Sequence, residues 1–570
     1  MTRARAIAAA RGLAPFDRLL AGGTLADVAT GELRAADIGI VGGLIASVHP
    51  PGARKDAAII DDVAGMVLAP GFIDSHLHYE SSLMTPADYA SVVVPAGTTT
   101  CVWDPHELAN VAGLDGVRWA RDAARGLSLR TIIAAPSCVP SAPGLEVAGA
   151  EIGPAEMAEM LRWDGVFGVA EVMDMAGVLD AAPRMAGIVA AGMAAGQNVQ
   201  GHARGLAGAD LQAYAASGVT SDHEITSAAD IVEKLRAGLT VELRGSHDYL
   251  LPEAVAAVMA LPVFPATLVL CTDDVFPDEL VAKGGLRDTI ARVIARGMPP
   301  MLALRCATLH AALRLKRDDI GLLSAGRAAD IVVLSDLHNV TVARCYAAGL
   351  PATAEAPRPP AGLRDTMRLA PLTPEALSLR PKGAGALPVV GGTRFTTWDS
   401  IDVATQDGIA MVPPGHSLLA AIHRHGRADP TPQVALASGW GEIHGAVATT
   451  ISHDSHNLMV FGRDPALMAI AANALIAAGG GMAVMEPDGR LTVLPLPIAG
   501  LLAETPAPET ARAFAALRDA ADRTVDWAPP FRIFRGLTAV SLACNPGPHL
   551  TDLGIADVAT GRVIDPALPL

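Results

Sequence analysis

The feature that most constrains the fold is an alternation of short apolar runs with alanine-rich stretches between about residues 70 and 320. Strand-like runs that alternate with helical ones are typical of βαβ units, which build parallel sheets. We expect eight strands, in the segments MVLAPGFIDSHLH, TTTCVWDP, LRTIIAAPSCVP, GVFGVAEV, NVQGHA, GVTSDHE, LTVELRG and ATLVLCTDD. Eight such units in roughly 250 residues is the size of a (β/α)8 barrel, so we predict an α/β fold built on this barrel.

The segments that flank the predicted barrel have a different texture. Residues 18–69 and 320–349 carry short apolar runs, and Gly-Gly pairs in the first segment indicate hairpin turns. We predict one small β-sandwich built from both flanks, with residues 1–69 as its first portion. Residues 320–365 would supply its second portion and a proline-rich linker at 351–362. The barrel would occupy 70–319, and a C-terminal α+β domain 366–570.

Two further patterns concern local structure. The string ADVATG occurs at 26–31 and again at 556–561, and we expect a hairpin turn at both places. The most membrane-like run, 467–484, contains Asn473 and three consecutive glycines at 479–481. A buried helix that ends at glycine fits this run better than a membrane span does.

Charge and cysteine usage limit the classes of partner. The formal net charge is -16, and the chain has no long basic run. Nucleic acid and anionic membranes both attract clustered Lys and Arg, so we expect neither as a partner. The six cysteines form no C-x-x-C pair, which is typical of a reduced, cytoplasmic protein.

Polar residues that can bind metal follow several of the expected strands. In a parallel barrel the loops after the strands meet in one mouth, where functional groups gather. His76 and His78 close the first strand and, two residues apart, point to the same side. The other candidates end later strands: Glu171 the fourth, His202 the fifth, His223 the sixth and Asp273 the eighth. Imidazoles and carboxylates in one cavity are ligands for divalent metals, and six are enough for two ions.

This set of residues resembles the amidohydrolase superfamily, metal-dependent hydrolases with a (β/α)8 barrel and a small β-sandwich. Many members bridge two metals with a carbamylated lysine on the fourth strand. This chain has no lysine between residues 56 and 233, so Glu171 is the expected substitute. Longer strings narrow the resemblance to adenine deaminases of the AdeC type: GFIDSHLHYESSLMTP, GTTTCVWDPHELANVAG, GVAEVMDMAGVL and, toward the C-terminus, SHDSHNLMVFG and HLTDLGIADV. At VELRGSHDY, Arg244 stands where the family's order places a glutamate.

The resemblance implies hydrolytic deamination of adenine to hypoxanthine and ammonia, a step of purine salvage. It implies a binuclear divalent metal centre, with Mn or Fe expected and Zn as an alternative, a small purine base as ligand, and a homo-oligomer of two or more chains. His76, His78 and Glu171 would hold one metal and His202 and His223 the other. Glu171 would bridge the two ions. Asp273 would ligate one metal and move a proton from water to the leaving nitrogen, so Asp273, Glu171 and His223 are the expected catalytic residues.

Attack at C6 requires a proton at N1, so a general acid should lie near that atom. The candidates are Glu80, His106, Glu107 and Glu224. The C-terminal residues His453, Asp454 and His456 would close over the substrate or order a turn.

Other functions remain open at this point. Another 6-aminopurine such as N6-methyladenine could be deaminated or dealkylated. A cyclic amidase of the dihydroorotase or hydantoinase type would use the same barrel but normally needs the missing lysine. A non-enzymatic assembly protein would be expected to lack several ligands. The zinc deaminases that flip bases from nucleic acid are excluded, because no P-C-x-x-C follows His78-Tyr79-Glu80.

Overall fold

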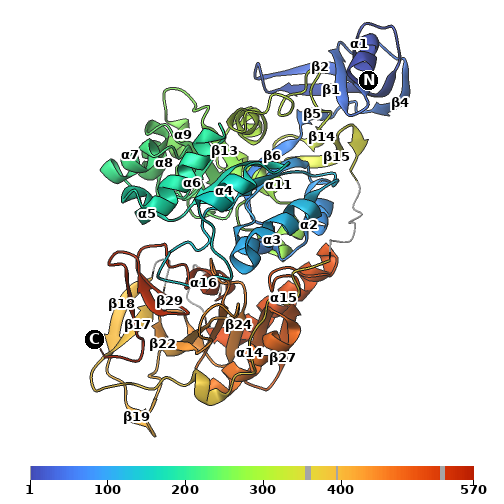
Figure 1. Cartoon of the computed structure of the whole chain (residues 1–570). Helices are drawn as coiled ribbons and strands as arrows, with labels where there is room; N and C mark the ends of the chain where they lie inside the picture. Colours follow the sequence, from blue (N-terminus) through green and yellow to red (C-terminus); the bar gives the residue numbers. More distant parts are fainter. Residues whose placement is uncertain (1, 353–360, 393–395, 527–532, 570) are drawn as a thin grey trace.

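The computed structural model describes residues 2–352, 361–392, 396–526 and 533–569 (Figure 1). Eight parallel strands lie at its centre and coincide with the eight predicted segments. They are β6 (Phe72–Leu77), β7 (Thr98–Trp103), β8 (Arg130–Ala135), β9 (Val166–Val172), β10 (Val199–Gly201), β11 (Ser221–Asp222), β12 (Thr240–Arg244) and β13 (Leu268–Cys271). The α/β barrel fold predicted from the sequence is therefore confirmed.

The barrel is made of two hydrogen-bonded sheets. One has five strands in the order β10-β9-β8-β7-β6 and the other has three in the order β11-β12-β13. At the seam between β13 and β6, Asp273 N donates to His76 O over 3.1 Å, beside a bridge between Leu77 and Asp273. At the seam between β10 and β11, Thr220 N donates to Val199 O over 2.9 Å.

Helices cover the outside of the barrel. They are α2 (Pro86–Val93), α3 (His106–Ala124), α4 (Pro154–Met160), α5 (Met175–Leu179), α6 (Pro183–Ala194), α7 (Gly208–Ala216), α8 (Ala228–Arg236), α9 (Leu251–Met259), α10 (Pro277–Lys283), α11 (Leu286–Ala295), α12 (Pro300–Arg305) and α13 (Ala311–Arg314). Their starts follow local chemistry. Thr85 caps α2, with Pro86 in its first turn, and Ser227 caps α8 by accepting from Asp230 N.

A flanking β unit with strands from both sides of the barrel is present, as predicted (Figure 1). Its strands are β1 (Phe16–Asp27), β2 (Glu32–Val41), β3 (Leu44–His49), β4 (Ala57–Asp62), β5 (Val67–Pro70), β14 (Ile331–Asp336), β15 (Thr341–Ala347) and β16 (Leu350–Pro351). They form one eight-stranded sheet in which β5 pairs with β14, and α1 (Thr2–Ala10) packs on it. One expectation was wrong: Gly22-Gly23 lies inside β1, at a bulge, and makes no hairpin turn. A Cβ on Gly23 would lie 2.8 Å from Leu68 Cδ1, so close packing explains this glycine.

Both copies of ADVATG form hairpin turns, as expected. The first joins β1 to β2, and the second joins β30 (Gly554–Asp557) to β31 (Arg562–Ile564). In each copy the aspartate accepts a hydrogen bond from the amide two residues later, and the final glycine has a positive φ. The same six residues therefore give the same turn in two unrelated sheets.

The C-terminal region is an eight-stranded sheet with two long helices. Its strands, in spatial order, are β18 (Thr397–Ile401), β17 (Leu387–Gly391), β22 (Gln433–Ser438), β21 (His416–Ile422), β25 (Leu458–Gly462), β24 (Ala446–Thr449), β26 (Gly481–Met485) and β27 (Leu491–Pro495). The run predicted to be a buried helix is α14 (Pro465–Ala478), which ends at Gly479 with a φ of 78°. The second long helix, α15 (Ala507–Thr524), packs against α10 of the barrel.

Shorter elements complete this region. They are β19 (Thr405–Gln406), β20 (Ile409–Ala410), β23 (Glu442–Ile443), β28 (Val525–Asp526), α16 (Ile533–Ala539) and β29 (Pro548–Thr551). Most of the linker predicted at 351–362 lies outside the described residues. Across the four described ranges, no helix is both long and apolar enough to cross a membrane.

Candidate metal centre and substrate cavity

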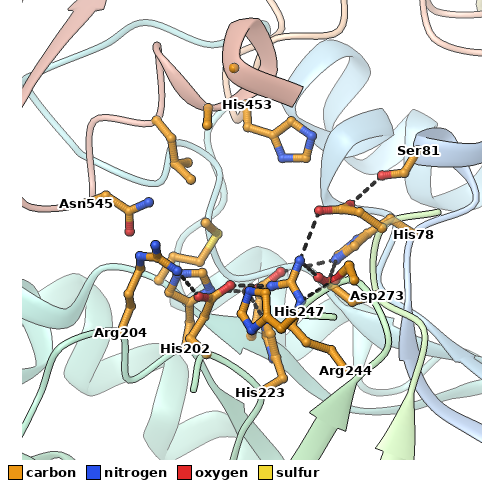
Figure 2. A pocket seen from close by; sticks show the side chains of 18 of the residues that line it. His78, Ser81, His202, Arg204, His223, Arg244, His247, Asp273, His453 and Asn545 are labelled. Carbon is orange, nitrogen blue, oxygen red and sulfur yellow. Dashed lines mark hydrogen bonds and ion pairs between the residues drawn. The ribbon is translucent and has the colours of Figure 1, made fainter. Parts of the chain in front are cut away.

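A cavity of about 220 Å³ lies at the mouth of the barrel, beneath the C-terminal region (Figure 2). Five of the six predicted metal ligands line it, and the sixth, His76, is buried beside them. The five are His78, Glu171, His202, His223 and Asp273. The strand ends therefore bring together every side chain that the sequence pattern singled out as a ligand.

Glu171 occupies the centre of this group. Its Oε2 lies 2.6 Å from His202 Nδ1 and 3.2 Å from His223 Nε2. Its Oε1 lies 3.3 Å from His78 Nε2. Burial alone would raise the pKa of Glu171, but the neighbouring imidazoles lower it well below its ordinary value. The two oxygens of one ionised carboxylate thus face different sets of nitrogen donors.

The two histidines of the first strand have their rings fixed from behind. His78 Nδ1 lies 3.0 Å from Asp104 O, and His76 Nδ1 lies 3.3 Å from Gln200 Oε1. An Nδ1–H that donates to these oxygens leaves Nε2 with a free lone pair. The two Nε2 atoms lie 3.1 Å apart, and both lie within 3.5 Å of Asp273 Oδ1.

These donors fit divalent metal ions. Within the sets His76/His78/Asp273 and His76/Glu171/His223, all donor atoms lie within 4.8 Å of one another. His202 Nε2 is buried and has no hydrogen-bond partner among the residues that the structure describes, which is costly unless a ligand satisfies it. Imidazoles and carboxylates without thiolate suit Mn, Fe and Zn.

Two arginines that the sequence did not indicate as site residues stand on the cavity wall. Arg204 and Arg244 each form an ion pair with Glu224, one on each carboxylate oxygen, and Arg244 also pairs with Asp273. Burial would raise the pKa of Glu224, but the two guanidinium groups lower it well below its ordinary value. Glu224 is therefore an ionised hydrogen-bond acceptor and does not have a proton to donate.

The other general-acid candidates occupy three different places. Glu80 does not line the cavity, and its oxygens accept from Trp103 Nε1 over 2.8 Å and Leu108 N over 3.3 Å. Glu107 is buried behind the wall, 3.4 Å from Ser81 Oγ. His106 does line the cavity.

His106 connects the metal ligands to the C-terminal region. Its Nδ1 lies 3.0 Å from Asp104 Oδ2 and 3.6 Å from Glu171 Oε1. Its Nε2 lies 3.7 Å from Asp454 Oδ1. His106 is thus the one candidate that both faces the cavity and lies beside the central carboxylate.

The predicted C-terminal residues lie over the barrel mouth. His453 lines the cavity, with Nε2 3.7 Å from Glu107 Oε1 (Figure 2). His456 Nε2 lies 3.7 Å from Glu107 Oε2, and His456 does not line the cavity. Asp454 is buried between His106 and His453, and within the described part of the chain its two oxygens have no hydrogen-bond partner.

Sequence reasoning missed most of the remaining C-terminal wall. Trp440, Leu542, Asn545 and His549 line the cavity from loops and short elements. Figure 2 shows Asn545 above Arg204, on the opposite side from His453. These residues belong to no sequence motif with the spacing of metal ligands or catalytic groups. The sequence alone therefore gives no sign that they line a cavity.

Comparisons with known proteins agree with this architecture. Residues 67–351 match the amidohydrolase family, and residues 393–562 match the adenine deaminase C-terminal domain. An adenine deaminase 2 of Rhizobium meliloti is 54% identical over 573 residues, which cover 99% of this chain and 96% of that protein. An adenine deaminase of Klebsiella pneumoniae is 52% identical over 578 residues, with 99% and 96% covered. An adenine deaminase of a Methylobacterium species is 37% identical over 569 residues, which cover 98% of this chain and 99% of that protein. Both halves of the cavity therefore lie in matched regions, and the chain belongs to the adenine deaminase family of amidohydrolases.

Proposed function

We propose that this protein hydrolyses adenine to hypoxanthine and ammonia. The observation that carries the proposal is the position of Glu171, between two sets of histidines at the floor of a cavity roofed by the adenine deaminase C-terminal domain. The full-length relatives that carry the name adenine deaminase support the same reaction. A cyclic amidase or an assembly protein is not favoured, because the ligand set is complete and differs from the lysine-bridged one.

Two divalent ions would be held by six residues: His76, His78, Glu171, His202, His223 and Asp273. When bound, such ions lower the pKa of a water molecule and make it a nucleophile at neutral pH. We propose Mn or Fe as the physiological metal, with Zn able to replace it, because the donor set contains no thiolate. Reconstitution of the metal-free protein with each metal, followed by an ammonia-release assay, tests this choice.

Protons are handled by side chains of the cavity wall. In hydrolysis, the water oxygen bonds to C6 and the bond from C6 to the amino nitrogen breaks. We assign Asp273 the transfer of the proton from the attacking water to the departing nitrogen, because this carboxylate lines the cavity and lies beside the ligand candidates His76 and His78. We assign Glu171 and His223 to the same catalytic group, because both would hold the ions that activate the water.

His106 is our choice for the general acid at N1. Of the four candidates, Glu80 and Glu107 do not line the cavity and Glu224 is held as a carboxylate by two arginines. His106 faces the cavity and is oriented by Asp104. His453, with Asp454 and His456 behind it, would close the cavity over the base.

The remaining expectations concern the setting of the enzyme. We propose a cytoplasmic homo-oligomer of at least two chains that acts in purine salvage. All six cysteines are free and buried, which fits a reducing compartment. Size-exclusion chromatography with light scattering tests the oligomeric state.

The substrate is tested by ammonia release from adenine, N6-methyladenine, adenosine, cytosine and guanine. We expect turnover of adenine above all others. No turnover of any of them by protein with two ions per chain would refute the substrate and leave the metal site in place.

A further inference from the structure

The barrel is weakly closed at the point where two metal-ligand candidates meet. His202 follows β10, the edge of the five-stranded sheet, and His223 follows β11, the edge of the three-stranded sheet. Within the continuously described residues 2–352, no ladder joins β10 to β11. These strands have only three and two residues, so little regular backbone pairing can set the distance between the two histidines.

A buried aspartate spans this seam. Asp222 Oδ1 accepts a hydrogen bond from Ala203 N, the amide directly after His202, and Asp222 itself directly precedes His223. The two edges approach closely, because a Cβ on Gly201 would lie 2.3 Å from Ser221 O. The backbone bond from Thr220 N to Val199 O joins the two edges below the cavity. The carboxylate of Asp222 joins them again beside the two histidines.

Lys234 of α8 holds that aspartate in place. Its side chain is fully buried, and Nζ lies 2.8 Å from Asp222 Oδ2 and 3.1 Å from Asp230 Oδ1. Nζ also donates to Glu224 O over 2.7 Å. The lysine therefore contacts the residues on both sides of His223, one through a side chain and one through a backbone carbonyl.

A buried ion pair contributes little net stability, because desolvation offsets the attraction between its charges. Fixing the orientation of nearby groups is a better-supported use for one. His202 is held a second time on the side of the fourth strand, since Tyr214 Oη accepts from His202 N over 3.0 Å and donates to Val172 O over 2.6 Å. The bond to Asp222 fixes the backbone at His202 relative to β11, and the bond to Tyr214 fixes it relative to β9.

We propose that Lys234, through Asp222, is a positioning residue that sets the separation of His202 and His223. It thereby controls the affinity of the metal position that these two histidines share. The position formed by His76, His78 and Asp273 lies at the opposite seam and does not depend on Lys234. This inference rests on the metal site of the proposed function and not on its substrate.

The test is a Mn²⁺ titration of full-length protein, with bound metal measured by elemental analysis after dialysis against graded chelator. The wild type is expected to bind two ions per chain. Lys234→Met should keep one ion at wild-type affinity and bind the second about 10- to 100-fold more weakly, the range found when residues that orient metal ligands are removed. Lys234→Arg keeps the charge and should recover most of that loss.

A matched control separates positioning from general destabilisation. Arg130→Met removes a partly buried ion pair between the start of β8 and Asp330, at 2.6 Å, which involves no residue of β10, β11 or α8. It should lower the melting temperature and leave two ions at wild-type affinity. If Lys234→Met does not fold, Asp222→Asn, which lacks the charge that Lys234 pairs with, replaces it and should show the same selective loss.

The proposal is overturned if Lys234→Met, or the Asp222→Asn substitute, binds both ions as tightly as the wild type, or if Arg130→Met loses the second ion equally. Failure of the proposed function looks different. A wild type that binds two ions but does not deaminate adenine would refute the substrate while leaving the metal titration interpretable.

Discussion

At the scale of single residues, position at the end of a strand was the informative signal. Each predicted ligand follows an apolar run, and parallel strands carry their following loops to one mouth, so convergence could be predicted without coordinates. The ion pairs of the cavity wall could not be predicted from the sequence. Arg204 and Arg244 reach Glu224 from the loop after β10 and from the end of β12, and no spacing in the sequence encodes a contact between these segments.

The first prediction separates a bridging role from a proton-transfer role. Glu171→Gln should lose metal, because both oxygens of Glu171 face imidazoles and an amide replaces one oxygen by a donor. Asp273→Asn should retain most metal and lose turnover by about 100-fold or more, the range typical of a missing acid or base. Elemental analysis and ammonia release measure the two effects. Full metal content and activity in Glu171→Gln would contradict the bridging role.

A second prediction concerns pH and stability at Glu146, on the loop after β8. Burial, followed by the charge of Asp454, raises the pKa of Glu146 to about 8. Between the ordinary pKa and this value the folded chain holds a proton that the unfolded chain has released, so stability falls as pH rises through this window. Each pKa unit corresponds to about 1.4 kcal/mol. From pH 5 to pH 8.5 the wild type should therefore lose a few kcal/mol in the free energy of unfolding. Glu146→Gln, whose amide does not titrate, should not show this loss.

Urea unfolding at the two pH values measures this difference. Glu151→Gln is the control, because the side chain of Glu151 is 72% exposed on the same segment. An equal pH response of the wild type and Glu146→Gln would show that Glu146 is ionised in the folded protein.

At the scale of elements, periodicity and turn residues predicted most of what is observed. Eight strands, the two ADVATG turns and the helix ending at Gly479 follow from local patterns. Gly22-Gly23 was misjudged because a bulge and a turn both favour glycine, and only the packing against Leu68 distinguishes them. The seam between β10 and β11 could not be predicted either, because strand pairing depends on the register between distant segments.

The loop of residues 453–457 depends on an arginine from a neighbouring strand end, and this gives a third prediction. Arg424 is fully buried and donates to three backbone carbonyls, those of His456, Thr366 and Ala499. Arg424→Met would leave these carbonyls unpaired, at about 1–3 kcal/mol for each buried group. Amide hydrogen exchange should become faster at 452–457, and deaminase activity should fall because His453 loses its fixed place over the cavity.

The control for this loop is Arg463→Met in the same sheet. Arg463 donates to Val412 O and Pro413 O, away from the cavity. Arg463→Met should destabilise the C-terminal region without making amide hydrogen exchange faster at 452–457. Unchanged exchange of that loop in Arg424→Met would contradict the role given to Arg424.

At the scale of the whole molecule, one hydrophobic cluster is shared by the barrel and the C-terminal region, which also has a cluster of its own. A single buried cluster runs from Leu83 and Tyr89 of the barrel to Phe514 and Leu517 of α15. Phe514 stacks on Phe276 with ring centroids 5.0 Å apart. This contact was not predictable, because the amphipathic pattern of α15 indicates a buried face but not which surface covers it. The shared core is what holds the roof of the cavity against its floor.

The last prediction follows from this shared core. Calorimetry of the wild type should show the barrel and the C-terminal region unfolding in one transition, because α15 packs on α10 and Arg518 pairs with Asp278 across the same boundary over 2.9 Å. Phe514→Ala removes a fully buried ring and should cost about 3–5 kcal/mol. Because the lost contacts lie between the two regions, we expect the transition to split and the KM for adenine to rise.

Phe16→Ala is the matched control, since Phe16 is equally buried but lies in the N-terminal sheet. It should lower the melting temperature while the barrel and the C-terminal region still unfold together, with an unchanged KM. A single transition in Phe514→Ala, shifted no further than that of Phe16→Ala and with a wild-type KM, would mean that other contacts hold the roof. The C-terminal region would then be fixed over the cavity by loop 453–457 and the strand ends around it, and not by α15.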